Sequence, residues 1–286
     1  MRLSDICLGL DSKYFILYIR RKGRFLREPV LVARPTGNFP PLFGSEAAEA
    51  LALWPDRYRP SRPFSNGMVA DYPAAEALVK RILALAGTVF RPSLTLYTAV
   101  ADPSPIARLI RTAGASSVEC VSMCEGSNRV IPGGLTAYFG DQVMISSKTG
   151  GTTFSDLGSD YLCRFIARAM RTNHRILIGG AEALRALECG ESRLTVTGRS
   201  LENGLPLSIS LSRDELDDLI RPACEELAVL ISDLAQGEAI TLAGRPPRPL
   251  AGILEASGRA AAPVVDEAMI ISQGAMRPAQ KPKKDF

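Results

Sequence analysis

The sequence is short of the residues from which metal sites and activated nucleophiles are most often built. Its only histidine is His174, so neither a serine–histidine pair nor a histidine-based metal site finds a partner, and we expect a surface position between two helices. The six cysteines form no Cys-x-x-Cys pair, and most lie in apolar runs: they are Cys7, Cys120, Cys124, Cys163, Cys189 and Cys224. We expect buried free thiols, with Cys120 and Cys124 packed in the core, and no metal site.

Long apolar runs are also missing. None approaches the ~20 residues that a helix needs to cross a bilayer. The first residues show no basic segment followed by an apolar core, so we expect no signal peptide and a cytoplasmic protein. The net charge is only +4, and much of it lies in the Pro- and Lys-rich end, Arg277–Phe286. We expect a disordered, solvated tail there, with contact to anionic lipid or an acidic partner as the alternative. Aromatic and basic residues are not interleaved, which argues against nucleic-acid binding.

What is present is the composition of an ordinary globular protein. Hydrophobic residues make up 46% and charged residues 22% of the chain. Its length of 286 residues is enough for two domains or one large two-lobed fold. The stretch Ile6–Ala33 predicts two or three antiparallel strands, with a tight turn at Gly9–Ser12. A strand at Leu94–Val100, a helix at Pro105–Ala113 and a strand at Val118–Met123 then predict an α/β fold with a partly parallel sheet.

A second meander follows the first. We expect strands at Val130–Ile131, Leu135–Phe139, Val143–Ser147 and Thr152–Phe154, separated by glycine turns. The Gly150-Gly151-Thr-Thr run reads as a hairpin turn, with a phosphate-binding nest as the alternative. Two halves that each open with hairpins and continue with helices indicate an internal repeat of architecture.

The other segments divide into loops and helices. The stretches Arg34–Phe43 and Asp56–Pro63 read as a loop and a basic, Pro-rich linker, on either side of a short helix at Glu46–Leu53 capped by Ser45. Ser212 and Glu215 form a capping box for a long helix to about Leu234, interrupted at Pro222. Further expected helices are Ala74–Ala86, Ser159–Arg171, Gly180–Glu188 and Leu250–Ala256, and further strands are Leu194–Thr197, Leu207–Leu211, Ala239–Ala243 and Pro263–Val265.

One segment resembles a known family. Arg62-Pro-Phe-Ser-Asn-Gly-Met-Val-Ala-Asp71 is similar to the bacterial actins of the MreB, rod-shape-determining, family, in which an Arg-Pro, a Gly and a Val/Ile-Ala-Asp lead into a helix. Further stretches resemble the family in the same order: Leu26–Pro29, Leu42–Ala48, Arg91–Ser93, Leu157–Asp160 and Val196–Pro206. Together they cover the chain from about residue 6 to 275.

The resemblance implies an α/β, actin-like, RNase H-like duplicated fold of two lobes, with mixed sheets flanked by helices. Lobe I would span 1–125, with a small insertion subdomain at about 34–62 and the segment 263–278 packed back on it. Lobe II would span 126–262, and 279–286 would be the disordered basic tail.

The family also implies ATP and Mg²⁺, but the sequence departs from its motifs where they would bind. The first-strand Asp that handles the metal aligns with Gly9, and the small turn residues align with Asp11–Tyr14, including Ser12. The second phosphate loop matches either Val130–Thr136, with Gly133 and Gly134, or Ser147–Thr153. We favour the first because the second leaves no room for the hairpin that must follow, and neither supplies the family's Asp.

The remaining motifs depart as well. The family's Glu-Glu-Pro, whose Glu positions the attacking water, aligns with Ser122–Cys124, and Glu125 is shifted and lacks the helix that should follow. On the adenine side, Gly244–Pro247 carries Arg and Pro that would crowd a base. Glu182 and Arg185 resemble the purine-side helix, although an exposed helix face explains them equally. The degraded ATP-site positions are Asp11, Ser12, Gly133, Gly134, Gly158, Glu182, Arg185 and Gly244.

Val89 and Phe90 precede Arg91-Pro92 in the loop where the family inserts apolar side chains into the membrane. They imply contact with the inner membrane, and the alternative is a helix-end contact with the core.

These observations predict an MreB-like cytoskeletal or scaffold protein that is not an enzyme and has no catalytic residues. It would be a pseudo-ATPase that self-associates or binds another bacterial actin of the cell-shape machinery, because the groups that hold metal and water are missing. The alternatives are an ATP-binding, filament-forming bacterial actin with noncanonical phosphate loops, and a kinase or chaperone-type ATPase of the same fold.

Overall fold

The chain folds into two compact units in a computed structural model that describes residues 6–65, 67–87, 91–132, 134–147, 151–258 and 261–276. The first unit contains residues 1–132 and 265–286, and the second contains 133–264. The sequence placed the division at 125/126, which lies inside helix α4 (Met123–Val130). This helix packs against α9 (Glu267–Met276), so the first unit continues to residue 132.

The main sheet of the first unit has the strand order β10-β9-β1-β2-β3. Its strands are β1 (Ile6–Leu10), β2 (Tyr14–Ile19), β3 (Arg24–Pro29), β9 (Ser93–Thr98) and β10 (Ser117–Ser122). Strand β1 pairs antiparallel with β2 and parallel with β9, so the expected hairpins and the partly parallel sheet are both present. A 3₁₀ turn, Arg20–Lys22, joins β2 to β3 and ends at Gly23, whose φ of 56° suits glycine.

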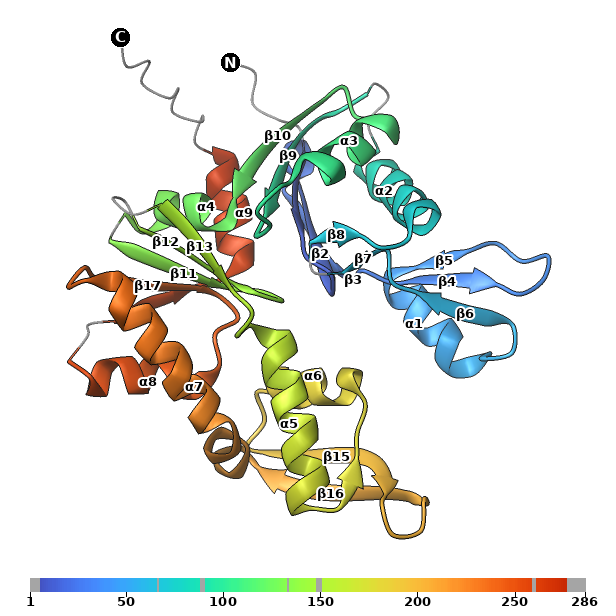
Figure 1. Cartoon of the computed structure of the whole chain (residues 1–286). Helices are drawn as coiled ribbons and strands as arrows, with labels where there is room; N and C mark the ends of the chain where they lie inside the picture. The colour runs from blue at the N-terminus through green and yellow to red at the C-terminus, as the bar shows by residue number, and fades with distance from the viewer. Residues whose placement is uncertain are drawn as a thin grey trace. The chain divides into compact units, whose positions relative to one another are not determined.

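Helices cover both faces of this sheet (Figure 1). Alternate side chains of β1, Ile6, Leu8 and Leu10, share one core with α2 (Tyr72–Ala86) and α3 (Ser104–Thr112). The intervening position Gly9 faces α4 and α9. Because successive residues of a strand point to opposite faces, a strand buried on both sides is apolar throughout, as Ile-Cys-Leu-Gly-Leu is.

A small three-stranded sheet occupies the region that was expected to be a loop and a linker. Strands β4 (Val32–Pro35), β5 (Leu42–Phe43) and β6 (Tyr58–Ser61) pair in the order β5-β4-β6, with α1 (Gly44–Leu53) against one face. The expected loop and linker were therefore wrong at β4 and β6, since Pro35 and Pro60 are accommodated in a short sheet. Ser45 does not cap α1, because its backbone N–H and hydroxyl both donate to the Glu28 carboxylate. A two-stranded hairpin, β7 (Phe64–Ser65) with β8 (Met68–Val69), then leads to α2.

The second unit repeats the hairpin architecture of the first. Its main sheet has the order β13-β12-β11-β17-β18. The strands are β11 (Leu135–Phe139), β12 (Val143–Ser147), β13 (Gly151–Ser155), β17 (Ile240–Gly244) and β18 (Ala261–Val265). Strand β11 pairs antiparallel with β12 and parallel with β17, as β1 does with β2 and β9. The expected strand at Val130–Ile131 was wrong: Val130 ends α4 and Ile131 is its C-cap.

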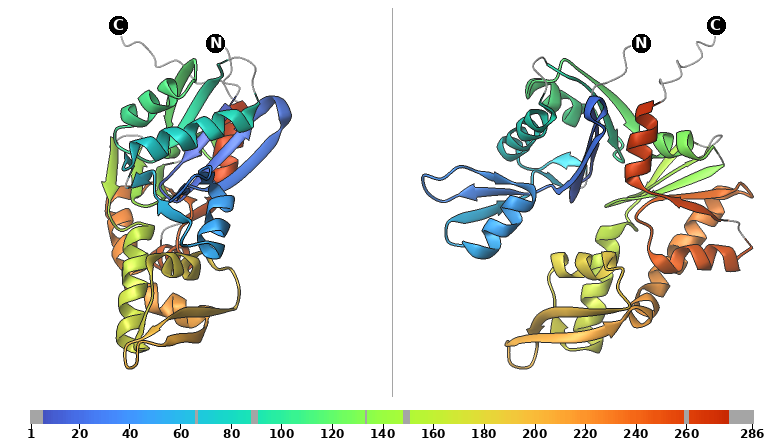
Figure 2. Two further views of the ribbon diagram at one scale, coloured as in Figure 1. Left: turned by 90° about the vertical axis from the view of Figure 1, so that its right-hand side faces the viewer. Right: turned by 180° about the vertical axis from the view of Figure 1, so that it is seen from behind.

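The rest of the second unit is a helical layer with a smaller sheet (Figure 2). Strands β14 (Ile176–Leu177), β15 (Arg193–Ser200) and β16 (Pro206–Ser212) form that sheet. The helices are α5 (Ser159–Asn173), α6 (Gly180–Glu188), α7 (Arg213–Ala235) and α8 (Arg248–Ala256). The capping box of Ser212 and Glu215 is confirmed, but α7 is not interrupted, because it continues through Pro222.

Candidate functional site

The turn between β1 and β2 holds its own carboxylate where the resemblance places a phosphate. Asp11 Oδ1 accepts hydrogen bonds from the backbone N–H groups of Lys13 and Tyr14, both at 2.6 Å. The Asp11 N–H donates to the Tyr14 carbonyl at 3.1 Å and closes the hairpin. An Asp that bonds the backbone two and three residues on is a stable turn in its own right. These two amide groups are therefore already occupied by an anionic side chain of the chain itself. Ser12, the other predicted phosphate-side residue of the first unit, lies in the same turn.

At the position aligned with the family's metal-handling Asp, a side chain would meet the end of a buried isoleucine. A β-carbon added at Gly9 would overlap the Cδ1 of Ile271, and it would lie 3.4 Å from the Cε of Met123. Ile271 is fully buried and Met123 is 3% exposed. A side chain at position 9 would therefore have to displace the end of the Ile271 side chain. The atoms of Ile271 and Met123 around this position are apolar and offer no oxygen ligand, so the residues present there do not fit a magnesium ion.

The segment aligned with the family's water-positioning Glu forms the start of α4. The prediction that no helix follows Glu125 was wrong: Ser122 is the N-cap, and its hydroxyl accepts from the Glu125 N–H at 3.0 Å. The signal was in the sequence, since Ser122 followed three residues later by Glu125 is a helix-start pattern. Glu125 forms an ion pair with Arg129 on the same helix, and 57% of its side chain is exposed. Hence the Ser122 hydroxyl serves as a cap and the Glu125 carboxylate lies in a surface ion pair.

Neither of the two stretches proposed for the second phosphate loop forms the turn that corresponds to β1–β2. By strand order that turn is Gly140–Gln142, between β11 and β12. In the favoured stretch, Val130 is helical, Gly133 lies outside the described residues, and a β-carbon at Gly134 would lie 2.6 Å from the Ala239 carbonyl oxygen. In the other stretch, Ser147 and Gly151 pair at the end of the β12–β13 hairpin. The sequence carried a signal for the correct turn, Gly140-Asp141 directly after an apolar strand.

The Gly140–Gln142 turn packs backbone against backbone within the second unit. The Ser159 N–H, at the start of α5, donates to the Gly140 carbonyl at 3.0 Å. The Arg245 N–H donates to the Phe139 carbonyl at 3.2 Å. A β-carbon at Gly158 would overlap the Asp141 carbonyl, and one at Gly244, where φ is 79°, would lie 2.6 Å from the Phe139 carbonyl oxygen. Gly158 and Gly244 are therefore required for this close packing, whatever else they bind.

The loop on the predicted adenine side is tied to α6. Arg245 forms an ion pair with Glu188 at the end of that helix. Pro246 and Pro247 offer no backbone N–H, and Pro247 is the N-cap of α8. Arg245 and the two prolines were predicted to crowd a base. Contacts within the second unit hold this loop in place.

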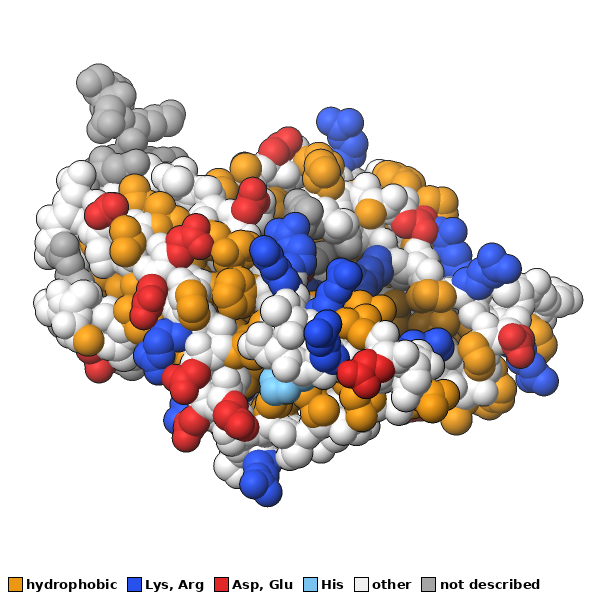
Figure 3. Space-filling view, turned by 60° about the horizontal axis from the view of Figure 1, so that its bottom comes forward, with side chains coloured by type: hydrophobic (Ala, Val, Ile, Leu, Met, Phe, Trp, Pro, Cys, Tyr) orange, Lys and Arg blue, Asp and Glu red, His pale blue; other side chains and the backbone are white. Residues whose placement is uncertain are grey.

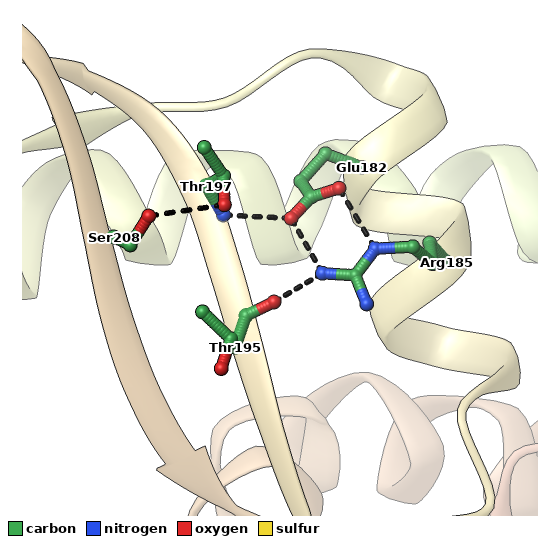
Figure 4. Close-up of polar contacts among 5 residues, drawn as sticks. All are labelled: Glu182, Arg185, Thr195, Thr197 and Ser208. Atoms are coloured by element: carbon green, nitrogen blue, oxygen red, sulfur yellow. Dashed lines mark hydrogen bonds and ion pairs between the residues drawn. The ribbon is translucent and has the colours of Figure 1, made fainter.

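Glu182 and Arg185 form one hydrogen-bonded group with the edge of β15 (Figure 4). Arg185 donates from Nε to Glu182 Oε2 at 2.9 Å and from Nη2 to Glu182 Oε1 at 2.7 Å. The Thr197 N–H also donates to Glu182 Oε1, at 2.7 Å, and Arg185 donates to the Thr195 carbonyl. The Arg185 hydrogen bonds are the main cause that lowers the pKa of Glu182, and the Glu182 carboxylate raises the pKa of Arg185. Their contacts are those of an edge cap that satisfies strand β15 where β14 has ended.

Among the described residues, the cysteines and the histidine form no reactive centre. Burial raises the pKa of Cys7 to about 11 and that of Cys224 to about 12, so these thiols are neutral and inert. Cys124 and Cys163 are buried as expected, but the expectation for Cys120 was wrong, because it is exposed on the edge strand β10. His174 is exposed, and the single histidine is visible at the surface in Figure 3. Among the described residues, no three His, Cys, Asp or Glu side chains are grouped so as to hold a metal ion.

Two predictions concern segments that the structure does not describe. Val89 and Phe90, and the tail 279–286, lie outside the described residues. No helix in the described part of the chain combines the length and apolarity that a membrane crossing requires.

Comparisons with known proteins give one consistent result. No protein-family profile matches the chain. The cell shape-determining protein Mbl of Bacillus subtilis is 23% identical over 264 residues, covering 82% of this chain and 78% of its own length. The cell shape-determining protein MreB of Escherichia coli is 25% identical over 246 residues, covering 74% of this chain and 71% of its own length.

Solved structures agree with the sequence relatives on the fold. The crystal structure of MreB5 of Spiroplasma citri bound to AMPPNP superposes with a TM-score of 0.77 at 16% identity, and 95% of each chain is covered. Its ADP-bound counterpart gives a TM-score of 0.71 over the same coverage. The α/β, actin-like fold expected from the sequence is thereby confirmed.

Proposed function

Because the chain is a divergent member of the MreB family of bacterial actins, we propose that it is a cytoskeletal or scaffold protein that acts by binding and does not hydrolyse ATP. It would self-associate or bind another bacterial actin and so serve cell shape, the role for which its relatives are named. We place it in the cytoplasm, in line with the composition of the chain.

The packing of Gly9 against Ile271 carries this proposal. Phosphoryl transfer needs a carboxylate that holds Mg²⁺ and a group that positions the attacking water. At position 9 the chain offers no side chain, and one could be added only by displacing the end of Ile271. The Asp11 carboxylate on the amides of Lys13 and Tyr14 supports the proposal independently, because it occupies donors that would otherwise face a phosphate.

The test is thermal melting with and without ATP and Mg²⁺, together with a phosphate-release assay on clean protein. A ligand at about 100 times its Kd stabilises the folded state by about 2.7 kcal/mol, which raises the melting midpoint of a chain of this size by a few degrees. We expect no such rise and no turnover. Phosphate release above a buffer blank would contradict the proposal, and a rise of several degrees would favour an ATP-binding protein instead.

An ATP-binding, filament-forming actin is the second candidate, and it is favoured by the likeness to a structure solved with AMPPNP. Glycine turns can cradle a phosphate through backbone amides even without a metal ligand. Asp11→Gly separates the two candidates, because it frees the amides of Lys13 and Tyr14. If the parent melts at a higher temperature with ATP and Asp11→Gly enhances the rise, the second candidate replaces the first.

Membrane contact through Val89 and Phe90 stays part of the proposal. It is tested by co-sedimentation with liposomes of anionic lipid, comparing the parent with Val89→Ser/Phe90→Ser. The double variant should sediment less with the liposomes, and equal sedimentation would remove the membrane contact.

A further inference from the structure

A pocket of about 520 Å³ lies between the small sheet of the first unit and the start of α2. Its polar lining consists of Arg34 and Thr36 of the β4 segment, Arg59 and Ser61 of β6, and Asp71, the N-cap of α2. The volume falls in the range of pockets that hold small molecules. The pocket lies wholly within the first unit, and none of its lining residues is a position aligned with the ATP site.

Two arginines stand directly opposite each other in this pocket. Strands β4 and β6 are antiparallel, and Arg34 pairs with Arg59 in their register. Side chains at directly paired positions lie on the same face of a sheet, about 5 Å apart at their β-carbons, and like charges there destabilise the pairing. The chain therefore holds two guanidinium groups together at a cost in stability.

Only one of the two arginines is neutralised. Asp71 forms an ion pair with Arg34, and it also accepts from the Ser61 hydroxyl at 2.5 Å and from the Ala74 N–H at 3.2 Å. Its carboxylate is thus fully engaged. Among the residues that the structure describes, no carboxylate pairs with Arg59, whereas the nearby Arg57 lies 5.5 Å from the ring centroid of Phe39. Among the described side chains, none offsets the remaining positive charge of this pocket.

From this geometry we infer that the pocket binds a phosphate group, held between Arg34 and Arg59. A guanidinium offers a planar fork of donors that matches phosphate oxygens. Arg59 offers its whole fork, and Arg34 offers the N–H groups that its ion pair with Asp71 leaves free. The ligand is either free phosphate or a small phosphate monoester, since 520 Å³ leaves space beside the phosphate for an organic group. This binding does not depend on whether the chain binds ATP.

The test is isothermal titration of the full chain with two probes, inorganic phosphate and glucose 6-phosphate, in the absence of nucleotide and with glucose as the blank. Binding of glucose 6-phosphate more tightly than phosphate identifies a monoester site, and equal or exclusive binding of phosphate identifies a free-anion site. Arg59→Gln should weaken the binding of whichever probe binds by at least about tenfold, because it removes charge-assisted hydrogen bonds. Arg59→Lys keeps the charge and loses the fork of donors, so its affinity should lie between those of the parent and Arg59→Gln.

Arg62→Gln is the matched control, because Arg62 is exposed, close in sequence and outside the pocket lining. It should bind both probes as the parent does. Thermal melting without ligand gives a second readout: Arg59→Gln should melt at or above the parent's midpoint, since it relieves the facing charges. The inference is overturned if neither probe binds, or if Arg59→Gln binds the probes as tightly as the parent. It is also overturned if Arg62→Gln loses as much affinity as Arg59→Gln, or if Arg59→Gln melts at a lower temperature than the parent.

Discussion

The backbone of Gly9 is in contact with the side chain of Ile271 on α9, 262 positions further along the chain. A glycine inside a strand usually weakens it, because the residue packs nothing and loses more entropy on folding. Here the missing side chain leaves space for the end of Ile271, so α9 lies directly against β1 at this position. The packing of two elements is thus set by the absence of one side chain.

Substituting Gly9→Asp should destabilise the fold by more than about 3 kcal/mol, because it both overpacks the core and buries a carboxylate among apolar atoms. Urea unfolding followed by circular dichroism measures this loss. Gly9→Asp combined with Ile271→Ala is the matched variant, and it should recover part of the loss by making room. If Gly9→Asp unfolds at the parent's urea midpoint, the described packing is wrong.

At the scale of elements, the start of α7 depends on its capping box. The Ser212 hydroxyl accepts from the Glu215 N–H at 3.2 Å, and the Glu215 carboxylate accepts from the Ser212 N–H at 2.6 Å. Ser212→Ala should cost about 1 kcal/mol, the usual value for the loss of an N-cap. Ser210→Ala, an identical change on the exposed face of β16, is the control and should be close to neutral. Equal effects of the two substitutions in urea unfolding would contradict a specific role for the cap.

The attachment of α6 to β15 should depend on pH. Arg185 and the Thr197 N–H hold the pKa of Glu182 below its ordinary value of 4.5. A carboxyl whose pKa is lower in the folded state stabilises the fold above its unfolded pKa, and this stabilisation is lost as the pH falls through the folded value. Glu182→Gln should therefore cost about 1 kcal/mol at neutral pH, and the difference from the parent should shrink below about pH 4.

Urea unfolding of the parent and Glu182→Gln over a pH series measures this difference. Glu255→Gln on the exposed end of α8 is the control for a general loss of negative charge. A difference between parent and Glu182→Gln that stays constant, or grows, as the pH falls would show that the carboxylate does not act through its charge.

Local chemistry was sufficient to predict most helices and strands. Contacts between segments that are distant in the sequence could not be predicted in this way. Neighbouring residues alone predict the turns at Gly9–Ser12 and Gly140-Asp141 and the apolar strands on either side of each turn. They also predict the capping box of Ser212 and Glu215. The small sheet was missed because Pro35 and Pro60 read as loop residues, and its pairing joins segments about 25 positions apart. Helix α4 was missed because the segment after Glu125 is shorter than in the family motif, although Ser122 and Glu125 form a helix-start pattern.

The candidate site could be predicted only in part. The sequence shows that Gly9 is not Asp and that Asp11 stands inside the turn. It does not show that Ile271 fills the space beside Gly9, or that the Asp11 carboxylate binds the amides of Lys13 and Tyr14, since both depend on three-dimensional packing. For the same reason, Glu182 and Arg185 read as ligand candidates in the sequence but serve as an edge cap of β15 in the structure.

On the scale of the whole molecule, the two units share a hairpin-led sheet, and each has its own hydrophobic core. If the protein works by association without nucleotide turnover, its assembly should not require ATP. Sedimentation velocity over a concentration series should show the same growth in size with and without ATP and Mg²⁺, and electron microscopy should show the same particles. Assembly that occurs only with nucleotide would restore the filament-forming ATPase.

The contact between Gly9 and Ile271 also bears on the history of the chain. Recovering a metal ligand at position 9 by reversion would require a second, compensating change in α9, because the single step passes through a badly folded intermediate. If the chain descends from an ATPase, an apolar side chain that fills the gap after the ligand is lost would oppose reversion, because selection acts on one substitution at a time. In that case the ancestral chemistry would no longer be one mutation away.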